Sequence, residues 1–223
     1  MKAMLVTLIA LLATLLAHPA TAAELRAEVQ RVPVVVTAGD SITWGGAPWD
    51  RQRVPYPAAL RKIGGDNIQV RNMGHPGACL LYEGCQGYET LMRETLRRDV
   101  WPKRPDVVIV SIGANDLGAR LPTADLKREY RAIRRDGARY GVKVLLATIT
   151  PGRNFWPADC EAQRQELNDW IRTLPHVDFD RALDNGVGEM RGRFDSGDGI
   201  HPSTPGYKSM ARAAWDALEW TRS

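Results

Sequence analysis

The sequence predicts an α/β domain of three layers, with helices on both faces of a parallel sheet of five strands. Runs of β-branched apolar residues alternate along the chain with amphipathic segments of helical period. The runs are nearly continuous, which is typical of strands covered on both faces, and the alternation implies right-handed crossovers. The length of 223 residues fits one domain with a sizeable core.

The expected strands are, in chain order, residues 33–37, 67–71, 106–112, 142–149 and 177–179. The expected helices are residues 56–63, 88–100, 123–140, 161–174 and 203–220. Helix boundaries rest on ordinary stop and start signals: Pro55 precedes the first helix, Thr123 suits the N-cap of the third, and Gly141 lies past its end. No internal repeat and no linker is apparent, so residues 23–223 are predicted to form a single domain.

The first 22 residues have the three-part pattern of a secretory signal peptide. Lys2 provides a short positive start, residues 5–17 form an apolar run, and residues 20–22 read Ala-Thr-Ala, a small-x-small cleavage site. An uncleaved anchor is the alternative, but the run is shorter than the about 20 residues that span a bilayer. We therefore expect a secreted or periplasmic protein with no stable membrane insertion after cleavage.

Charge argues against nucleic acid as a partner. The chain carries 30 basic and 26 acidic residues, a net charge of +4, and its local basic excess is at most a pair such as Arg97-Arg98. Nucleic-acid binders usually show a basic stripe or block. A mild attraction to anionic polysaccharide surfaces remains compatible with this balance.

In an oxidising compartment, two of the three cysteines can form a disulfide. Cys79 and Cys85 lie six residues apart in a Gly-rich loop, where a disulfide can form. Cys160 is then either buried and free or the true partner of one of them. No Cys-x-x-Cys and no paired His–Cys spacing indicates zinc.

Three polar clusters follow predicted strands, and a fourth lies near the C-terminus of the chain. Binding and catalytic sites of parallel sheets lie at the carboxyl ends of the strands, so we expect the four clusters to line one pocket. They are residues 39–43, 72–77, 113–116 and 198–202. Ser41 follows a Gly-Asp turn at the mouth of a buried strand, which suits an exposed nucleophile. The alternative role for Ser41 is that of a turn or N-cap residue.

A serine nucleophile needs a base, and the chain beyond the signal peptide offers His75, His176 and His201. Asp198 lies three residues before His201 and can reach its Nδ1. An oxyanion needs donors at fixed positions, and the N–H of Ser41, the N–H of Gly77 and the Asn115 amide are candidates. A metal site at Asp195, Asp198 and His201 is disfavoured, because no further ligand lies at suitable spacing.

These motifs resemble the SGNH hydrolase superfamily, the GDSL-type esterases and lipases, over nearly all of the chain after the signal peptide. Ser41 stands in Gly-Asp-Ser-Ile-Thr, Gly77 ends Asn-x-Gly-x-x-Gly, Asn115 stands in Gly-Ala-Asn-Asp, and Asp198 and His201 stand in Asp-Gly-Ile-His-Pro. Ile42 replaces the leucine of the family's name motif, and Gly74 is the alternative to Gly77.

The resemblance implies a flavodoxin-like fold and a catalytic triad of Ser41, His201 and Asp198. It also implies an oxyanion hole of Ser41, Gly77 and Asn115, with no metal and no organic cofactor. We thus expect a secreted serine esterase that acts on a small-molecule or glycan ester, with short acyl groups such as acetyl preferred.

An acyltransferase with the same triad and a lysophospholipase or lipase are the alternatives. An intact set of residues disfavours a non-catalytic binding module. Three tryptophans, Trp44, Trp49 and Trp156, are expected either to rim the pocket or to pack in the core.

Overall fold

The structure is a computed structural model that describes residues 31–46, 54–81, 91–152 and 156–218. Residues 33–223 form one compact unit, which contains all the helices and strands of the described ranges. The predicted signal peptide and Trp49 lie outside the described residues. Within the described ranges, no helix has both the length and the apolar character needed to cross a membrane.

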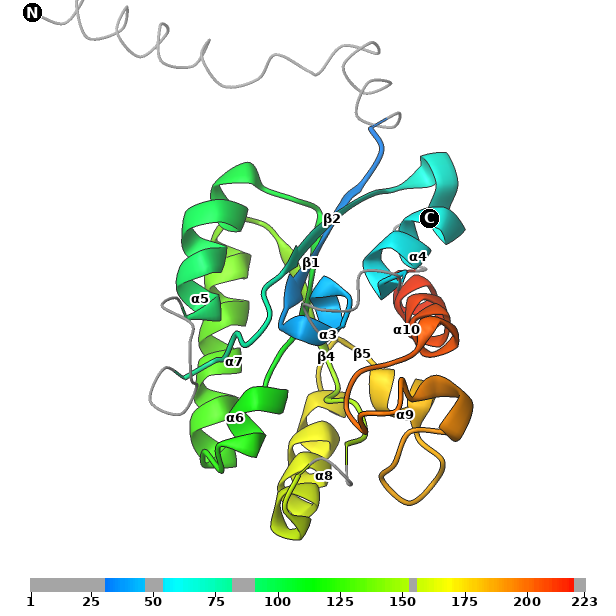
Figure 1. Cartoon of the computed structure of the whole chain (residues 1–223). Coiled ribbons are helices and arrows are strands. Elements are labelled where there is room, and N and C mark those ends of the chain that lie inside the picture. Colours follow the sequence, from blue (N-terminus) through cyan, green and yellow to red (C-terminus); the bar gives the residue numbers. More distant parts are fainter. Residues whose placement is uncertain (1–30, 47–53, 82–90, 153–155, 219–223) are drawn as a thin grey trace, which may run out of the picture. The chain divides into compact units, whose positions relative to one another are not determined.

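A five-stranded sheet forms the middle of this unit, and all its strand pairs are parallel. The spatial order is β2-β1-β3-β4-β5 (Figure 1). The predicted fold class is therefore confirmed. The strands are β1 (Val34–Gly39), β2 (Gln69–Gly74), β3 (Val107–Ser111), β4 (Lys143–Ala147) and β5 (His176–Val177).

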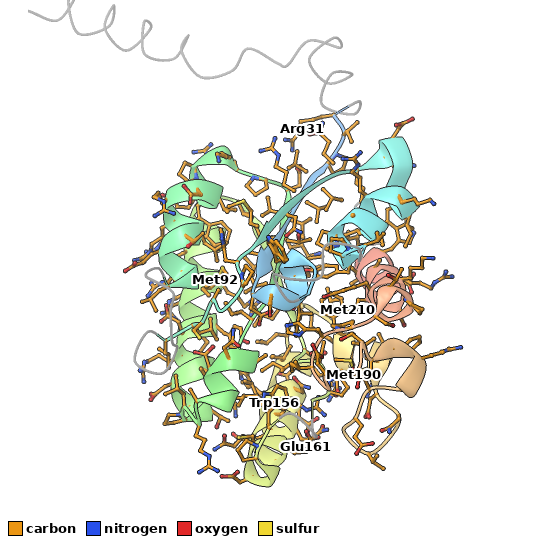
Figure 2. All side chains as sticks on the ribbon, viewed as in Figure 1. Arg31, Met92, Trp156, Glu161, Met190 and Met210 are labelled. Carbon is orange, nitrogen blue, oxygen red and sulfur yellow. The ribbon has the colours of Figure 1, made fainter. Side chains whose placement is uncertain are left out.

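Helices cover both faces of the sheet (Figure 1). On one face α4 and α10 pack against each other, and on the other face lie α5, α7 and α8. Buried Met92 on α5 and buried Met210 on α10 mark the two halves of the core (Figure 2). The helices are α4 (Tyr56–Gly64), α5 (Met92–Thr95), α7 (Thr123–Arg139), α8 (Ala158–Arg172) and α10 (Thr204–Ala217).

Three one-turn helices were not among the expected elements, since a single turn is too short to show a helical period. They are α3 (Ser41–Trp44), α6 (Ala114–Gly118) and α9 (Phe179–Leu183). Phe179 was expected to end the fifth strand. It begins α9 instead, because the Asp178 side chain caps this helix by accepting from Arg181 N at 3.1 Å.

The second expected helix is shorter and less regular than predicted. After α5 the backbone continues as a π-helical stretch over Leu96–Val100 and a 3₁₀ turn over Trp101–Lys103. Residues 88–90 lie outside the described ranges.

Buried charges fix the carboxyl end of β4, and periodicity alone did not reveal them. Arg164 on α8 is fully buried and donates to Ile149 O at 2.9 Å, and it pairs with Asp180 and Glu161. Asn168 accepts from Ile149 N at 2.7 Å and donates to Ile149 O at 2.9 Å. A buried arginine is tolerated only with such partners, so this network holds the residues after β4 in one position.

Candidate active site

The carboxyl ends of β1, β2 and β3 are level with one another. Gly39 pairs with Gly74 on one side and with Ser111 on the other. A Cβ on Gly39 would lie 2.0 Å from Ser111 O, and a Cβ on Gly74 would lie 2.2 Å from Trp44 N. Side chains at these two positions would clash with backbone, so only glycine allows the segments after the strands to pack this closely.

Ser41 is the first residue of α3, directly after β1. Its neighbour Asp40 is the N-cap and accepts from Ile42 N at 2.9 Å, so the capping role considered for Ser41 belongs to Asp40. The first N–H groups of a helix have no acceptor within the helix, which leaves Ser41 N pointing out of it. Ser41 is thus held on a capped turn at the edge of the sheet.

Ser41, His201 and Asp198 are joined by hydrogen bonds, although Ser41 and His201 are 160 residues apart in the chain. Ser41 Oγ lies 2.8 Å from His201 Nε2, and His201 Nδ1 lies 2.7 Å from Asp198 Oδ2. Asp198 Oδ1 also accepts from His201 N at 2.8 Å and from Ile200 N at 3.1 Å. Partial burial opposes ionisation of Asp198, but the hydrogen bonds from His201 and Ile200 outweigh it and lower the pKa of this carboxyl.

The loop that carries Asp198 is closed by a second carboxylate. Asp195 Oδ1 accepts from Gly197 N at 2.8 Å and from Gly199 N at 3.1 Å, the residues on either side of Asp198. Both glycines have positive φ, 102° and 80°, which suits glycine far better than other residues. Asp195 therefore fixes the backbone from which the Asp198 side chain projects.

The same loop occurs a second time, as a short repeat that was not expected from the sequence. Asp184 Oδ1 accepts from Gly186 N at 2.9 Å and from Gly188 N at 3.0 Å. Both segments read Asp-x-Gly-x-Gly, and each is closed by an antiparallel bridge. In the second copy Val187 takes the place that Asp198 has in the first.

The three predicted oxyanion donors come from three separate segments. Ser41 lies on α3, Gly77 in the loop after β2 with φ of 80°, and Asn115 on α6. The Asn115 amide donates to Ala78 O at 2.9 Å, which ties α6 to the Gly77 loop. Gly74 N donates to Asn72 Oδ1 at 2.9 Å and is therefore occupied, which favours Gly77 over Gly74 as the donor.

Two buried carboxyls lie under these segments. Asp116 accepts from Leu80 N at 3.0 Å and from Leu81 N at 2.9 Å, so it holds the loop that contains Gly77. Burial raises the pKa of Asp116 to about 6 against these hydrogen bonds. Burial, together with the nearby charge of Asp116, raises the pKa of Asp40 to about 7.

The remaining candidates from the sequence fall into different places. His75 N donates to Gly39 O at 2.8 Å, which places His75 at the start of the Gly77 loop. His176 lies in β5, and its Nδ1 is 2.8 Å from Leu174 O. Trp44 is 37% exposed beside Ser41, whereas Trp156 is buried near α6 (Figure 2).

Cys79 is disulfide-bonded and Cys160 is a buried free cysteine. The possibility that Cys160 pairs with another cysteine is therefore wrong. Its Sγ lies instead 3.2 Å from Leu117 O, packed between α6 and α8. Cys85 lies outside the described residues.

Among the residues that the structure describes, no three histidine, cysteine, aspartate or glutamate side chains gather in a way that could hold a metal ion.

A three-layer fold with a serine, a histidine and an aspartate linked in series is typical of serine hydrolases. The model of the GDSL-like lipase/acylhydrolase family matches residues 37–209, which include all the predicted site residues. The chain belongs to this family, within the SGNH hydrolase superfamily.

Relatives with solved structures share the fold. A GDSL-like lipase from Bacteroides thetaiotaomicron superimposes with a TM-score of 0.64 at 20% identity, over 87% of this chain and 94% of its own. An acetylxylan esterase from Geobacillus stearothermophilus gives a TM-score of 0.63 at 19% identity, over 83% of this chain and 94% of its own.

In sequence, the chain is 28% identical to an acetylxylan esterase from Xylanibacter ruminicola, over 83% of this chain. It spans only 43% of the length of that relative.

We expect Asp116→Ala to lower kcat about tenfold or more with little change in KM, since alanine removes the acceptor of both backbone hydrogen bonds that hold the Gly77 loop. A misplaced oxyanion donor reduces the stabilisation of the transition state more than the binding of the ester, so kcat falls more than KM rises. Steady-state hydrolysis of p-nitrophenyl acetate measures this split. Unchanged kcat in a folded variant would contradict a positioning role for Asp116.

Asp195→Ala and Asp184→Ala form a matched pair, because each removes the same two hydrogen bonds from the same kind of loop. Both should lose similar stability, about 1–2 kcal/mol. Only Asp195→Ala should lower kcat, by about tenfold, because only its loop carries Asp198. Urea unfolding and ester hydrolysis of both variants test this. Equal activity of the two variants would show that Asp195 is merely structural.

Stability should fall as pH rises from about 4 to 7. The folded chain holds the Asp40 proton up to about pH 7, whereas an unfolded aspartate loses it near 3.8, so the folded state binds more protons in between. Asp40→Asn keeps an N-cap acceptor and should make this decline shallower. Urea unfolding at pH 5, 6, 7 and 8 measures it, with the exposed Asp66→Asn as control. Parallel curves for Asp40→Asn and wild type would disprove the assignment.

Proposed function

We propose that this chain is a secreted serine esterase that removes short acyl groups, acetyl above all, from a carbohydrate. One observation carries the proposal: Ser41 Oγ is 2.8 Å from His201 Nε2, and His201 Nδ1 is 2.7 Å from Asp198 Oδ2. This is the geometry in which a histidine can take the proton of a serine while a carboxylate holds the ring in the required tautomer.

In the first step, His201 Nε2 accepts the Ser41 proton as Oγ attacks the ester carbonyl. The oxyanion that forms receives hydrogen bonds from Ser41 N, Gly77 N and the Asn115 amide. Asp198 stabilises the imidazolium through Nδ1–H. Collapse of the tetrahedral intermediate breaks the bond to the alcohol, which leaves with the proton from Nε2, and an acyl-serine remains.

In the second step, water enters where the alcohol left. His201 Nε2 takes a proton from the water as its oxygen attacks the acyl carbon, and the same donors stabilise the second oxyanion. The bond to Ser41 Oγ then breaks, Oγ recovers the proton from His201, and the carboxylic acid departs.

Two features support a carbohydrate ester as substrate: the similarity of the chain to acetylxylan esterases, and an exposed tryptophan next to Ser41. The Xylanibacter ruminicola relative and the Geobacillus stearothermophilus structure are both named acetylxylan esterases. Trp44 is 37% exposed and ends the helix that Ser41 begins, where its ring can stack on a sugar.

Secretion is supported by two independent features. The first 22 residues have the pattern of a cleavable signal peptide. Cys79 is disulfide-bonded, and structural disulfides persist mainly in oxidising compartments.

Ser41→Ala and His201→Ala should each reduce turnover of p-nitrophenyl acetate by orders of magnitude, and Asn115→Ala by about 10²–10³, as for the loss of one oxyanion donor. Ser209→Ala is the control, because Ser209 lies on α10 and donates to Ala182 O. A mild effect of Asn115→Ala would exclude its oxyanion role.

The acyl preference is measured with p-nitrophenyl acetate, butyrate and octanoate, and with acetate release from acetylated xylan. Activity that falls with chain length, with acetate released from the polymer, is the expected result. Activity that rises with chain length would favour a lipid ester. Turnover that requires an added sugar acceptor would favour an acyltransferase.

A further inference from the structure

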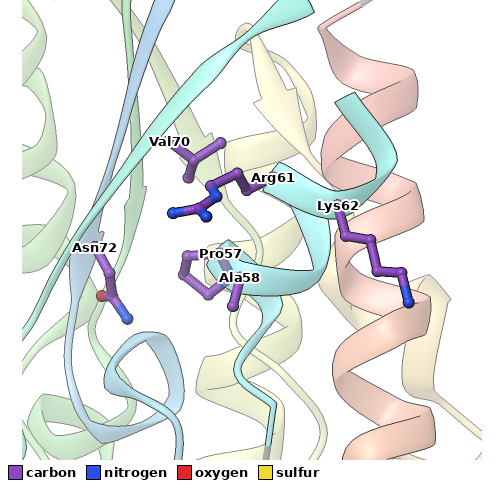
Figure 3. Close-up of a pocket in the computed structure, with 6 residues that line it drawn as sticks. All are labelled: Pro57, Ala58, Arg61, Lys62, Val70 and Asn72. Atoms are coloured by element: carbon purple, nitrogen blue, oxygen red, sulfur yellow. The ribbon is translucent and has the colours of Figure 1, made fainter. Parts of the chain in front are cut away.

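A groove lies beside the catalytic segments and takes no part in the two steps of ester hydrolysis. It is bounded by α4 on one side and by the edge strand β2 on the other, and its volume is about 530 Å³ (Figure 3). That volume is in the range of sites for small ligands. Its described lining residues are Pro57, Ala58, Arg61, Lys62, Val70 and Asn72.

The charged side chains in the described lining of the groove are both basic. Arg61 and Lys62 line it, and neither forms an ion pair with any residue that the structure describes. Figure 3 shows Arg61 extending from α4 toward the side of β2 that carries Asn72, whereas Lys62 points away from Asn72. An arginine fork facing an amide is suited to a carboxylate, which accepts hydrogen bonds in the plane of the guanidinium.

The described lining residues other than Arg61, Lys62 and Asn72 are apolar. Pro57 and Ala58 from α4 and Val70 from β2 offer carbon surface beside the Arg61 head group. A ligand that fits must therefore present a carboxylate together with C–H groups. A uronic acid residue has both, since its ring carries a face of C–H groups and its C6 is a carboxylate.

The groove adjoins the segment of the nucleophile. Asn72 Nδ2 donates to Trp44 O at 3.3 Å, and Trp44 is the last residue of the α3 turn that begins with Ser41. Three residues of helix correspond to about 4.5 Å along the axis. A sugar chain with an ester at Ser41 can thus pass the exposed Trp44 ring and place a neighbouring residue in the groove.

We propose that this groove is a subsite for the carboxylate of an acidic, acetylated glycan, with Arg61 as its principal recognition residue. This inference rests on the proposed deacetylation of a carbohydrate. It narrows the substrate class from glycan esters in general to esters on uronate-bearing chains.

The test uses acetylated xylo-oligosaccharides separated by anion exchange into a neutral and a uronate-bearing fraction of equal acetyl content. Acetylated oligogalacturonides, with the carboxylate in the main chain, form a third substrate. The wild type, Arg61→Gln and Arg135→Gln are compared on each. Arg135 is exposed on α7, on the opposite face of the sheet, and serves as the charge-matched control.

Wild type should prefer one uronate-bearing substrate over the neutral fraction, and higher salt should reduce that preference. Arg61→Gln should lower the ratio of kcat/KM on that substrate to kcat/KM on the neutral fraction about tenfold, the effect of losing one charge-assisted contact. Arg135→Gln should leave the ratio at the wild-type value. Which acidic substrate responds tells whether the carboxylate belongs to a side group or to the main chain.

An equal ratio in wild type and Arg61→Gln would overturn the inference and leave the esterase proposal intact. Failure of the wild type to release acetate from every glycan, while it hydrolyses p-nitrophenyl acetate through Ser41, would instead overturn the carbohydrate substrate itself. The two failures are therefore distinguishable.

Discussion

The site depends on the register of β1 between its two neighbours. Because Gly39 pairs with both Gly74 and Ser111, three strands end at one level, and the segments that come after them start side by side. This register allows no side chain at position 39, since a Cβ on Gly39 would lie 2.0 Å from Ser111 O. α3, the Gly77 loop and α6 are therefore placed by backbone hydrogen bonds before any polar side chain contributes.

Carboxylates then fix the segments that the sheet has placed. Asp116 holds the Gly77 loop and Asp195 holds the loop of Asp198, each by accepting two backbone N–H groups. Asp40 caps the turn of Ser41 by accepting one backbone N–H, that of Ile42. Backbone donors have no freedom to move away, so they define a position more sharply than a flexible arginine would. The buried Asp40 and Asp116 carry a desolvation cost, which is seen in their raised pKa values.

The sequence predicts the strands and the longer helices because buried β-branched runs and amphipathic periods are local signals. It also names Ser41, His201 and Asp198, which the fold brings together, since these stand in recognisable motifs. It could not reveal Arg164, whose burial depends on partners from α9 and the end of β4. Nor did it reveal Asp195, whose importance lies in backbone N–H groups that no pattern of residue types displays. One-turn helices such as α6 could not be predicted, because a single turn is too short to show a repeating hydrophobic pattern.

The contact between Ser41 and His201 closes over 160 residues, which ties chemistry to the completion of folding. Contacts of such long range form late, after shorter loops have closed. Ser41 is synthesised early, in the first strand–turn unit, and His201 only just before α10. A nascent chain that already contains Ser41 but still lacks His201 therefore has no complete triad during its synthesis. The triad is therefore complete only when β1 has paired within the sheet and α10 has packed against it.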